Sequence, residues 1–205
     1  VESCRGINLR ERLSLTVDER PVVAGSLYQW YSPHTHRSHE FVSLTADAVS
    51  GEYEGQPVWN VQQPGITWRE LNDAPRPSSS PTVRLAQMRQ IVSQYSCQKT
   101  DRAGLTNPLR LLRQPVYRYQ CPAHDVVDGA LFTFVQGTDP EVWILLETRT
   151  IDGELAWRLA ATRMNSIQFV LTSPSEEIWR GDVLTWTDVK SRKGAYTTYR
   201  VSETE

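Results

Sequence analysis

The chain has 205 residues, of which 39% are hydrophobic and 22% are charged. This length and composition predict one large domain or two small ones with a buried core, and they exclude a disordered chain. The formal net charge of −2 and the isoelectric point near 6.1 exclude a uniformly basic nucleic-acid-binding protein, and no segment approaches the ~20 apolar residues of a membrane span.

Short aromatic and β-branched runs predict antiparallel strands in residues 8–73. The clearest is Leu27-Tyr28-Gln29-Trp30, which follows a Val-Val pair and a glycine. Residues 41–45 form a second run, and the polar segment 32–38 between the two is predicted to be the turn.

A Pro/Ser-rich segment, 74–81, and one helix, 82–95, are predicted next. Four apolar residues of the helix recur at three- and four-residue steps and form a stripe: Leu85, Met88, Val92 and Tyr95. The composition of 74–81 predicts an extended and solvated linker. Residues 96–108, after the helix, have the composition of a loop.

The remainder, 109–201, predicts further strands, and its landmarks repeat those of the first part in the same order. A Val-Val pair, a glycine and alternating aromatics return in 125–134, and Ile66-Thr67-Trp68 is matched by Leu184-Thr185-Trp186. The second copy is longer because it contains the apolar run 142–147. The last strand is predicted at 194–201.

We therefore predict an α+β fold, mostly antiparallel β, in which two similar β units are joined by one amphipathic helix. Units of roughly 80 residues are marginal alone, so a single composite domain over 1–205 is favoured over two independent domains. Its parts are the first repeat, 8–73, the linker and helix, 74–98, and the second repeat, 109–201.

The cysteines and the composition bear on location. Three cysteines leave two alternatives open, a disulfide between Cys97 and Cys121 or three free thiols. The first residue is Val1 rather than Met, the chain has twelve prolines, and seven Trp and eight Tyr outnumber four Phe. These features favour an extracytoplasmic location, periplasmic or secreted.

Several segments carry a resemblance to a known group of proteins. The run from Gly129 to Glu141, the segment 111–119 before it, the helix segment 84–89 and the Val58-Trp59 pair resemble a family of uncharacterised bacterial proteins. The resemblance covers most of residues 20 to 180. It implies export, because many members of the family are made with export signals, and it implies no activity and no catalytic residue.

Three of the four histidines lie close together, at His34, His36 and His39. Imidazoles two residues apart on an extended segment lie on the same side and can share a Zn²⁺ or Cu²⁺ ion. The alternative is a solvated histidine-rich turn, which is favoured because Arg37 places a positive charge inside the cluster.

Charge is unevenly distributed along the chain. Residues 84–118 are strongly basic and residues 40–73 are strongly acidic. The candidate residues for binding a polyanion, with tyrosines interleaved, are Arg84, Arg89, Arg110, Arg113 and Arg118. The alternative is that this basic segment faces the acidic one within the molecule, or is simply a solvated surface.

Three tryptophans on predicted strands are candidates for an aromatic platform that contacts a sugar ring or a peptide: Trp30, Trp143 and Trp157. Trp59 and Trp179 occupy matching places in the two copies and are predicted to be core residues.

Enzyme signatures are scarce. The sequence has no P-loop, no Gly-x-Gly-x-x-Gly, no Gly-x-Ser-x-Gly and no Cys-x-x-Cys. Asp128, Asp139 and Glu141 are the candidate carboxylates for acid–base chemistry, although each also fits an ordinary turn or strand.

The leading hypothesis is a non-catalytic binding or interaction module that meets a protein or a glycan through an aromatic patch or a sheet edge. The alternatives are a hydrolase whose carboxylates converge from both repeats, and a carrier with a pocket for a small ligand or lipid between helix and sheet. We expect no cofactor, no membrane span and no nucleic-acid partner.

Overall fold

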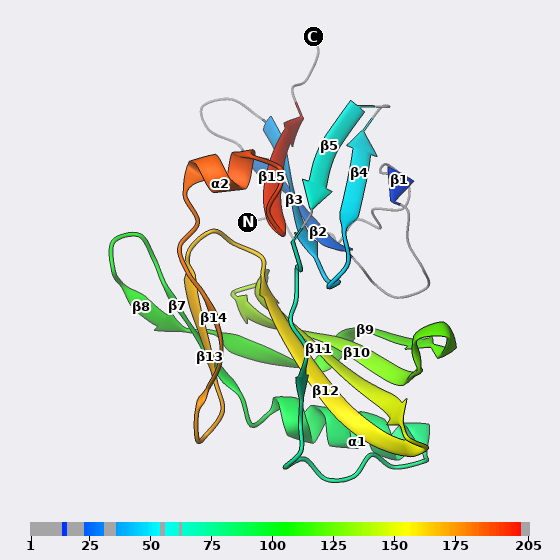
Figure 1. Ribbon diagram of the computed structural model, residues 1–205. Coiled ribbons are helices and arrows are strands. Elements are labelled where there is room, and N and C mark those ends of the chain that lie inside the picture. The colour runs from blue at the N-terminus through cyan, green and yellow to red at the C-terminus, as the bar shows by residue number, and fades with distance from the viewer. Residues whose placement is uncertain (1–13, 16–22, 31–35, 54–55, 62, 202–205) are drawn as a thin grey trace. The chain divides into compact units, whose positions relative to one another are not determined.

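The computed structural model describes residues 14–15, 23–30, 36–53, 56–61 and 63–201 (Figure 1). Every strand pairing among these residues is antiparallel, so the predicted mostly antiparallel β character is confirmed. The contacts divide the chain into two compact units. Unit 1 comprises 1–66, 164–166 and 184–205, and unit 2 comprises 67–163 and 167–183.

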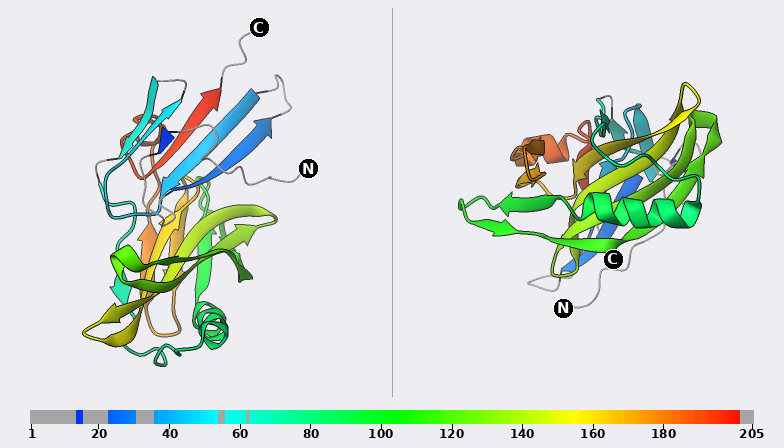
Figure 2. Two further views of the ribbon diagram at one scale, coloured as in Figure 1. Left: turned by 90° about the vertical axis from the view of Figure 1, so that its right-hand side faces the viewer. Right: turned by 90° about the horizontal axis from the view of Figure 1, so that it is seen from below.

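Unit 1 contains two three-stranded sheets. The first has the order β15-β3-β2, with bounds Tyr196–Val201, His36–Ser43 and Val23–Trp30. The second has the order β1-β4-β5, with bounds Ser14–Leu15, Val49–Tyr53 and Gln56–Val61. The left view of Figure 2 shows β15, β3 and β2 side by side.

The core of unit 1 joins side chains from both of its sheets. Phe41 from β3 packs with Val49, Val58, Trp59 and Val61 from β4 and β5. The indole Nε1 of Trp59 donates a hydrogen bond to the carbonyl oxygen of Gly194 at 2.9 Å, which satisfies its one polar atom in the core.

A short helix, α2 (Trp186–Lys190), precedes β15. It begins with a capping box in which Thr185 and Asp188 each bond the other's backbone. The buried Val189 of α2 and the hydrogen bond from Thr197 Oγ1 to its carbonyl oxygen, at 2.8 Å, fasten the helix onto β15.

Unit 2 contains two larger sheets. The five-stranded sheet has the order β6-β12-β11-β10-β9, with bounds Arg69–Glu70, Glu154–Arg163, Asp139–Ile151, Val126–Gln136 and Arg110–Cys121. The four-stranded sheet has the order β14-β13-β7-β8, with bounds Glu177–Gly181, Gln168–Thr172, Ser96–Thr100 and Thr106–Pro108. A 3₁₀ turn, η2 (Pro122–His124), joins β9 to β10.

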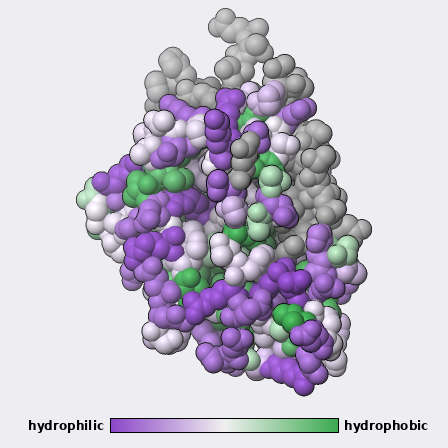
Figure 3. All heavy atoms as spheres, viewed as in Figure 1, coloured by the Kyte–Doolittle hydropathy of each residue, from purple (hydrophilic) through white to green (hydrophobic). Residues whose placement is uncertain are grey.

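The helix α1 (Pro81–Val92) covers the core face of the five-stranded sheet, as the right view of Figure 2 shows. Alternate residues of β10, β11 and β12 point to the same face, and these are apolar: Ala130, Phe132, Phe134, Val142, Ile144, Leu146, Trp157, Leu159 and Ala161. Met88, Ile91 and Val92 of α1 pack against them. The face of unit 2 seen in Figure 3 is mostly hydrophilic, with scattered apolar side chains, as expected of a protein surface.

Three local expectations need correction. Residues 96–108 form the hairpin β7–β8 instead of a loop, because β7 gains its neighbour β13 from a distant part of the chain. The linker 74–81 is fastened rather than freely solvated: Trp157 Nε1 donates to the carbonyl of Pro75 at 2.8 Å. The buried face of α1 includes Arg84 and Ile91, whereas the predicted Leu85 is only partly buried.

The described elements do not show the predicted internal duplication. The matched landmarks lie in different surroundings, since Trp68 precedes the strand β6 and Trp186 begins the helix α2. The predicted last strand, β15, pairs with β3 of the first copy. The helix α1 belongs to unit 2, and α2 is a second helix.

None of the helices in the described part of the chain has the length and apolar character needed to cross a bilayer.

Candidate functional site

The structure gathers all five predicted polyanion-binding arginines on two neighbouring elements. Arg84 and Arg89 lie on α1, and Arg110, Arg113 and Arg118 lie on the edge strand β9. Neither element contains an acidic residue. We call the exposed and half-buried side chains of these two elements the α1–β9 surface.

A buried carboxylate from β10 joins the helix to the strand. Asp128 is 1% exposed, and its Oδ2 accepts from Arg84 Nε at 2.9 Å while its Oδ1 accepts from Arg118 Nε at 2.8 Å. The hydrogen bond to Asp128 raises the pKa of Arg118 above its ordinary value. Arg84 Nη1 also donates to the carbonyls of Ser78 and Ser79, and Arg118 Nη2 donates to the carbonyl of Pro81. This cluster fixes the start of α1.

The other three arginines make no ion pair with any residue that the structure describes. Arg89 donates to Gln114 Oε1 of β9, and its Nε is buried without a partner among the described residues. Arg110 donates to the carbonyl of Gly137 at 3.1 Å, and Arg113 is exposed. These three charges are therefore not neutralised by a described carboxylate, in contrast to Arg84 and Arg118.

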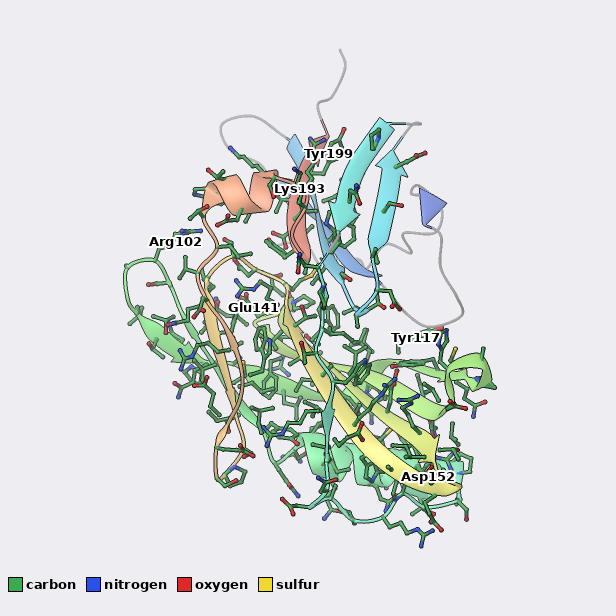
Figure 4. The ribbon with its side chains drawn as sticks, viewed as in Figure 1. Arg102, Tyr117, Glu141, Asp152, Lys193 and Tyr199 are labelled. Carbon is green, nitrogen blue, oxygen red and sulfur yellow. The ribbon has the colours of Figure 1, made fainter. Side chains whose placement is uncertain are left out.

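Two exposed apolar side chains lie on β9, the strand that carries Arg110 and Arg113. Val116 is 55% exposed and Tyr117 is 51% exposed. Figure 4 labels Tyr117, whose ring is stacked against that of Tyr119 with 6.1 Å between the centroids. Exposed aromatic rings next to arginine are typical of protein interfaces.

The backbone of β9 explains this exposure. Tyr117 pairs with Leu131 and Leu112 pairs with Thr133, so residues 113–116 bulge out of the ladder with β10. Pro115 lies in the bulge and has no N–H to contribute to it. A bulge re-aims the side chains that it carries, and here it carries Arg113 and Val116 at the edge of the sheet.

The alternative for the basic segment 84–118 was that it faces the acidic segment 40–73 within the molecule. Some of its residues do pair with carboxylates of the same chain, but with other ones. Arg84 and Arg118 pair with Asp128, and Lys99 Nζ lies 2.8 Å from Glu141 Oε1. Both carboxylates lie in the second half of the chain, not in the acidic segment 40–73.

The predicted aromatic residues are not gathered on a surface. Trp143 is 6% exposed and Trp157 is 2% exposed, so neither offers a ring face to solvent. Trp30 ends the strand β2, and its side chain is outside the described part.

The histidine cluster is only partly described. His34 lies outside the described residues, and His36 and His39 lie on β3. His39 is buried, and its ring stacks on Phe41 with 5.9 Å between centroids. Among the described residues no group of three or more His, Cys, Asp or Glu side chains is placed to hold a metal ion.

Two of the cysteines are described, and both are buried free thiols, Cys97 on β7 and Cys121 on β9. The disulfide alternative is therefore not what the structure contains. Burial raises the pKa of the Cys97 thiol to about 12, with a smaller contribution from Glu141, so this thiol is protonated and poorly nucleophilic near neutral pH.

Sequence reasoning missed a second buried polar cluster, centred on Glu147 of β11. Its Oε1 accepts from Tyr119 Oη at 2.7 Å and its Oε2 accepts from Arg158 Nε at 2.7 Å. The Arg158 guanidinium lies 4.0 Å from the centroid of the Trp68 ring. The available signal was a glutamate ending an uninterrupted apolar run, because a carboxylate buried in a sheet requires a cationic partner.

The comparisons with known proteins identify no relative. No family model, no curated protein and no solved structure matches the chain. The resemblance to exported bacterial proteins stays a prediction.

Proposed function

We propose that the protein is a non-catalytic interaction module and that the α1–β9 surface binds an acidic, extended segment of a protein partner. The observation that carries the proposal is the combination on adjacent elements of unneutralised Arg89, Arg110 and Arg113 with exposed Val116 and Tyr117. Complementary charge steers such a partner to the surface, and burial of the apolar side chains holds it there.

A protein partner is favoured over a glycan by the kind of apolar group exposed. Val116 is aliphatic and lies beside a single exposed ring, Tyr117. Aliphatic side chains pack against the side chains of a peptide, whereas a sugar ring is best met by the flat face of an aromatic ring.

The buried carboxylates favour a binding protein over a hydrolase. Asp128, Glu141 and Glu147 are each bonded to a cationic side chain. Each of these carboxylates is buried against a cationic side chain of the fold, whereas the carboxyls of a hydrolase must be able to reach the bond that they cleave. The extracytoplasmic location and the internal duplication stay predictions, and the binding proposal depends on neither.

The test uses a labelled synthetic peptide in which Glu and Val alternate, with the fluorescence anisotropy of the label as readout. We expect saturable binding that weakens as salt is added. The double variant Arg110→Glu, Arg113→Glu should weaken it at least about tenfold, and Tyr117→Ala should weaken it without changing its salt dependence.

The matched control is Lys190→Glu, Lys193→Glu, which reverses two exposed charges in unit 1 and should leave the affinity unchanged. Absence of binding at low salt would contradict the proposal, as would equal losses in the two double variants. Saturable binding of heparin but not of the peptide would assign the surface to an anionic glycan instead.

A further inference from the structure

The edge strands of the four sheets differ in how they are protected. An unprotected edge exposes a row of backbone N–H and C=O groups that can pair with another strand. Natural sheets prevent such pairing with short strands, prolines, bulges, charges or a covering segment. Within the described residues the four sheets have eight edge strands: β1, β2, β5, β6, β8, β9, β14 and β15.

Seven of these edges carry a protective feature. The strands β1 and β6 have two residues each, and β8 has three and ends at Pro108. Each of β5 and β9 combines a proline with a register shift, and β14 combines a register shift with charged Glu177 and Arg180. The helix α2 packs along β15.

The exception is β2. It spans eight residues, Val23–Trp30, and its register with β3 is unbroken from Val23↔Ser43 to Trp30↔His36. Its sequence, VAGSLYQW, contains no charged residue and no proline. A regular, uncharged strand of this length at an edge is a template for pairing with a further strand.

We propose that this edge pairs with β2 of a second copy of the chain, so that the two β15-β3-β2 sheets become one continuous six-stranded sheet. A two-fold axis normal to the sheet makes the two β2 strands antiparallel. Because facing residues must share a face of the sheet, the central register places either Ser26 or Leu27 opposite itself. Both registers bring only uncharged residues together.

Charge is the reason for choosing a second copy as the occupant. Antiparallel self-pairing sets one end of a strand against the other end of its copy, so a strand whose charges all have the same sign repels its copy. The edge β9 carries Arg110, Arg113 and Arg118 and would repel a second β9. The edge β2 has no such charge, so among the described edges it is the one whose sequence permits regular self-pairing. This inference concerns unit 1 and is independent of the α1–β9 surface.

The experiment measures the molar mass of the full chain by light scattering and sedimentation velocity over a wide concentration series. We expect a mass twice the 23.4 kDa of one chain, falling to the single-chain mass on dilution. Hydrogen exchange of amides 23–30 should slow as the dimer forms, while amides of β10 in unit 2 should not change.

The variants Ser26→Lys and Leu27→Lys each place two lysines near the axis, and either should abolish the dimer. Adjacent residues point to opposite faces of a strand, so the two substitutions test both faces, and circular dichroism and thermal melting will identify the variant that folds like the wild type. The matched control is Leu105→Lys, which adds the same charge at a residue that is 61% exposed on the β7–β8 hairpin.

Three results would overturn the proposal. The first is a single-chain mass at every concentration. The second is a dimer that persists in the folded lysine variants of β2, and the third is a dimer that Leu105→Lys also abolishes.

Discussion

Buried charge is the most consequential feature at the scale of single residues. Asp128 and Glu147 are almost completely buried on mostly apolar strands; Asp128 bonds two arginines and Glu147 bonds one. A buried ion pair adds little net stability relative to a well-packed apolar pair, but removing one partner leaves the other charge without compensation. These residues therefore favour particular contacts between elements. Asp128 bonds α1 and β9 through Arg84 and Arg118. Glu147 of β11 bonds Tyr119 of β9 and Arg158 of β12.

The first prediction concerns Asp128→Asn. The substitution preserves the shape of the side chain but leaves the Arg84 guanidinium, which is 3% exposed, without its counter-charge. We expect the free energy of unfolding, measured by urea denaturation, to fall by about 3–5 kcal/mol.

The control for this prediction is Glu177→Gln, which removes one partner of the exposed Arg180–Glu177 pair and should leave the free energy of unfolding close to that of the wild type. Equal losses in the two variants would show that Asp128 does not compensate a buried charge.

At the scale of elements, α1 forms because of what it packs against. Its N-cap residue, Ser80, makes no side-chain capping bond, and its first turn has no acidic residue. Its last turn does carry Arg89, which is favourable at a helix C-terminus. A helix of this length is marginal in isolation, so burial of Met88, Ile91 and Val92 against the sheet supplies most of its stability.

The second prediction tests this dependence with Met88→Ala. Met88 is 0% exposed in the core of unit 2, and its truncation should lower the unfolding free energy by about 2–5 kcal/mol through lost burial and a cavity. Val83→Ala, at a residue of the same helix that is 48% exposed, should change it by under about 0.5 kcal/mol. Denaturation of both variants under identical conditions is the measurement, and a larger loss from Val83→Ala would refute the packing argument.

The elements that could be predicted from the sequence are those with a local pattern. The alternation in residues 116–120 and 131–135 and the helical stripe around Met88 located β9, β10 and α1, because each pattern is local. The β7–β8 hairpin escaped prediction because Ser96–Thr100 is polar and becomes a strand by pairing with β13. The bulge at 113–116, which shapes the candidate site, depends on the register with β10 and has no local signature beyond Pro115.

At the scale of the whole molecule, strands that are neighbours in a sheet can be far apart in the sequence. The strand β15, near the end of the chain, pairs with β3 near its beginning, so the elements of unit 1 come from both ends of the sequence. Each unit has its own cluster of buried apolar residues. Local unfolding follows such cooperative clusters.

The third prediction uses Tyr196→Ala. Tyr196 is buried on β15, and its hydroxyl donates to Glu40 Oε1 of β3 at 2.9 Å. Truncation should accelerate hydrogen exchange in β3, corresponding to a local loss of about 3–5 kcal/mol, while the amides of β10 and β11 keep their protection.

The control is Thr198→Ala, a half-buried residue on the same strand, which should leave exchange in β3 close to that of the wild type. Equal acceleration in β3 and β10 would mean that the two core clusters open together.

The sequence by itself determined the mostly antiparallel β character, the position of α1 and the concentration of arginine in 84–118, because composition, periodicity and charge are local properties. Only the tertiary structure decided that Arg84 and Arg118 share Asp128, that Trp157 is buried, and that Arg110, Arg113 and Tyr117 stand at a sheet edge. Those outcomes depend on strand order and register, which are set by contacts between segments distant in the chain, and the identity of a residue does not reveal which neighbour neutralises or buries it.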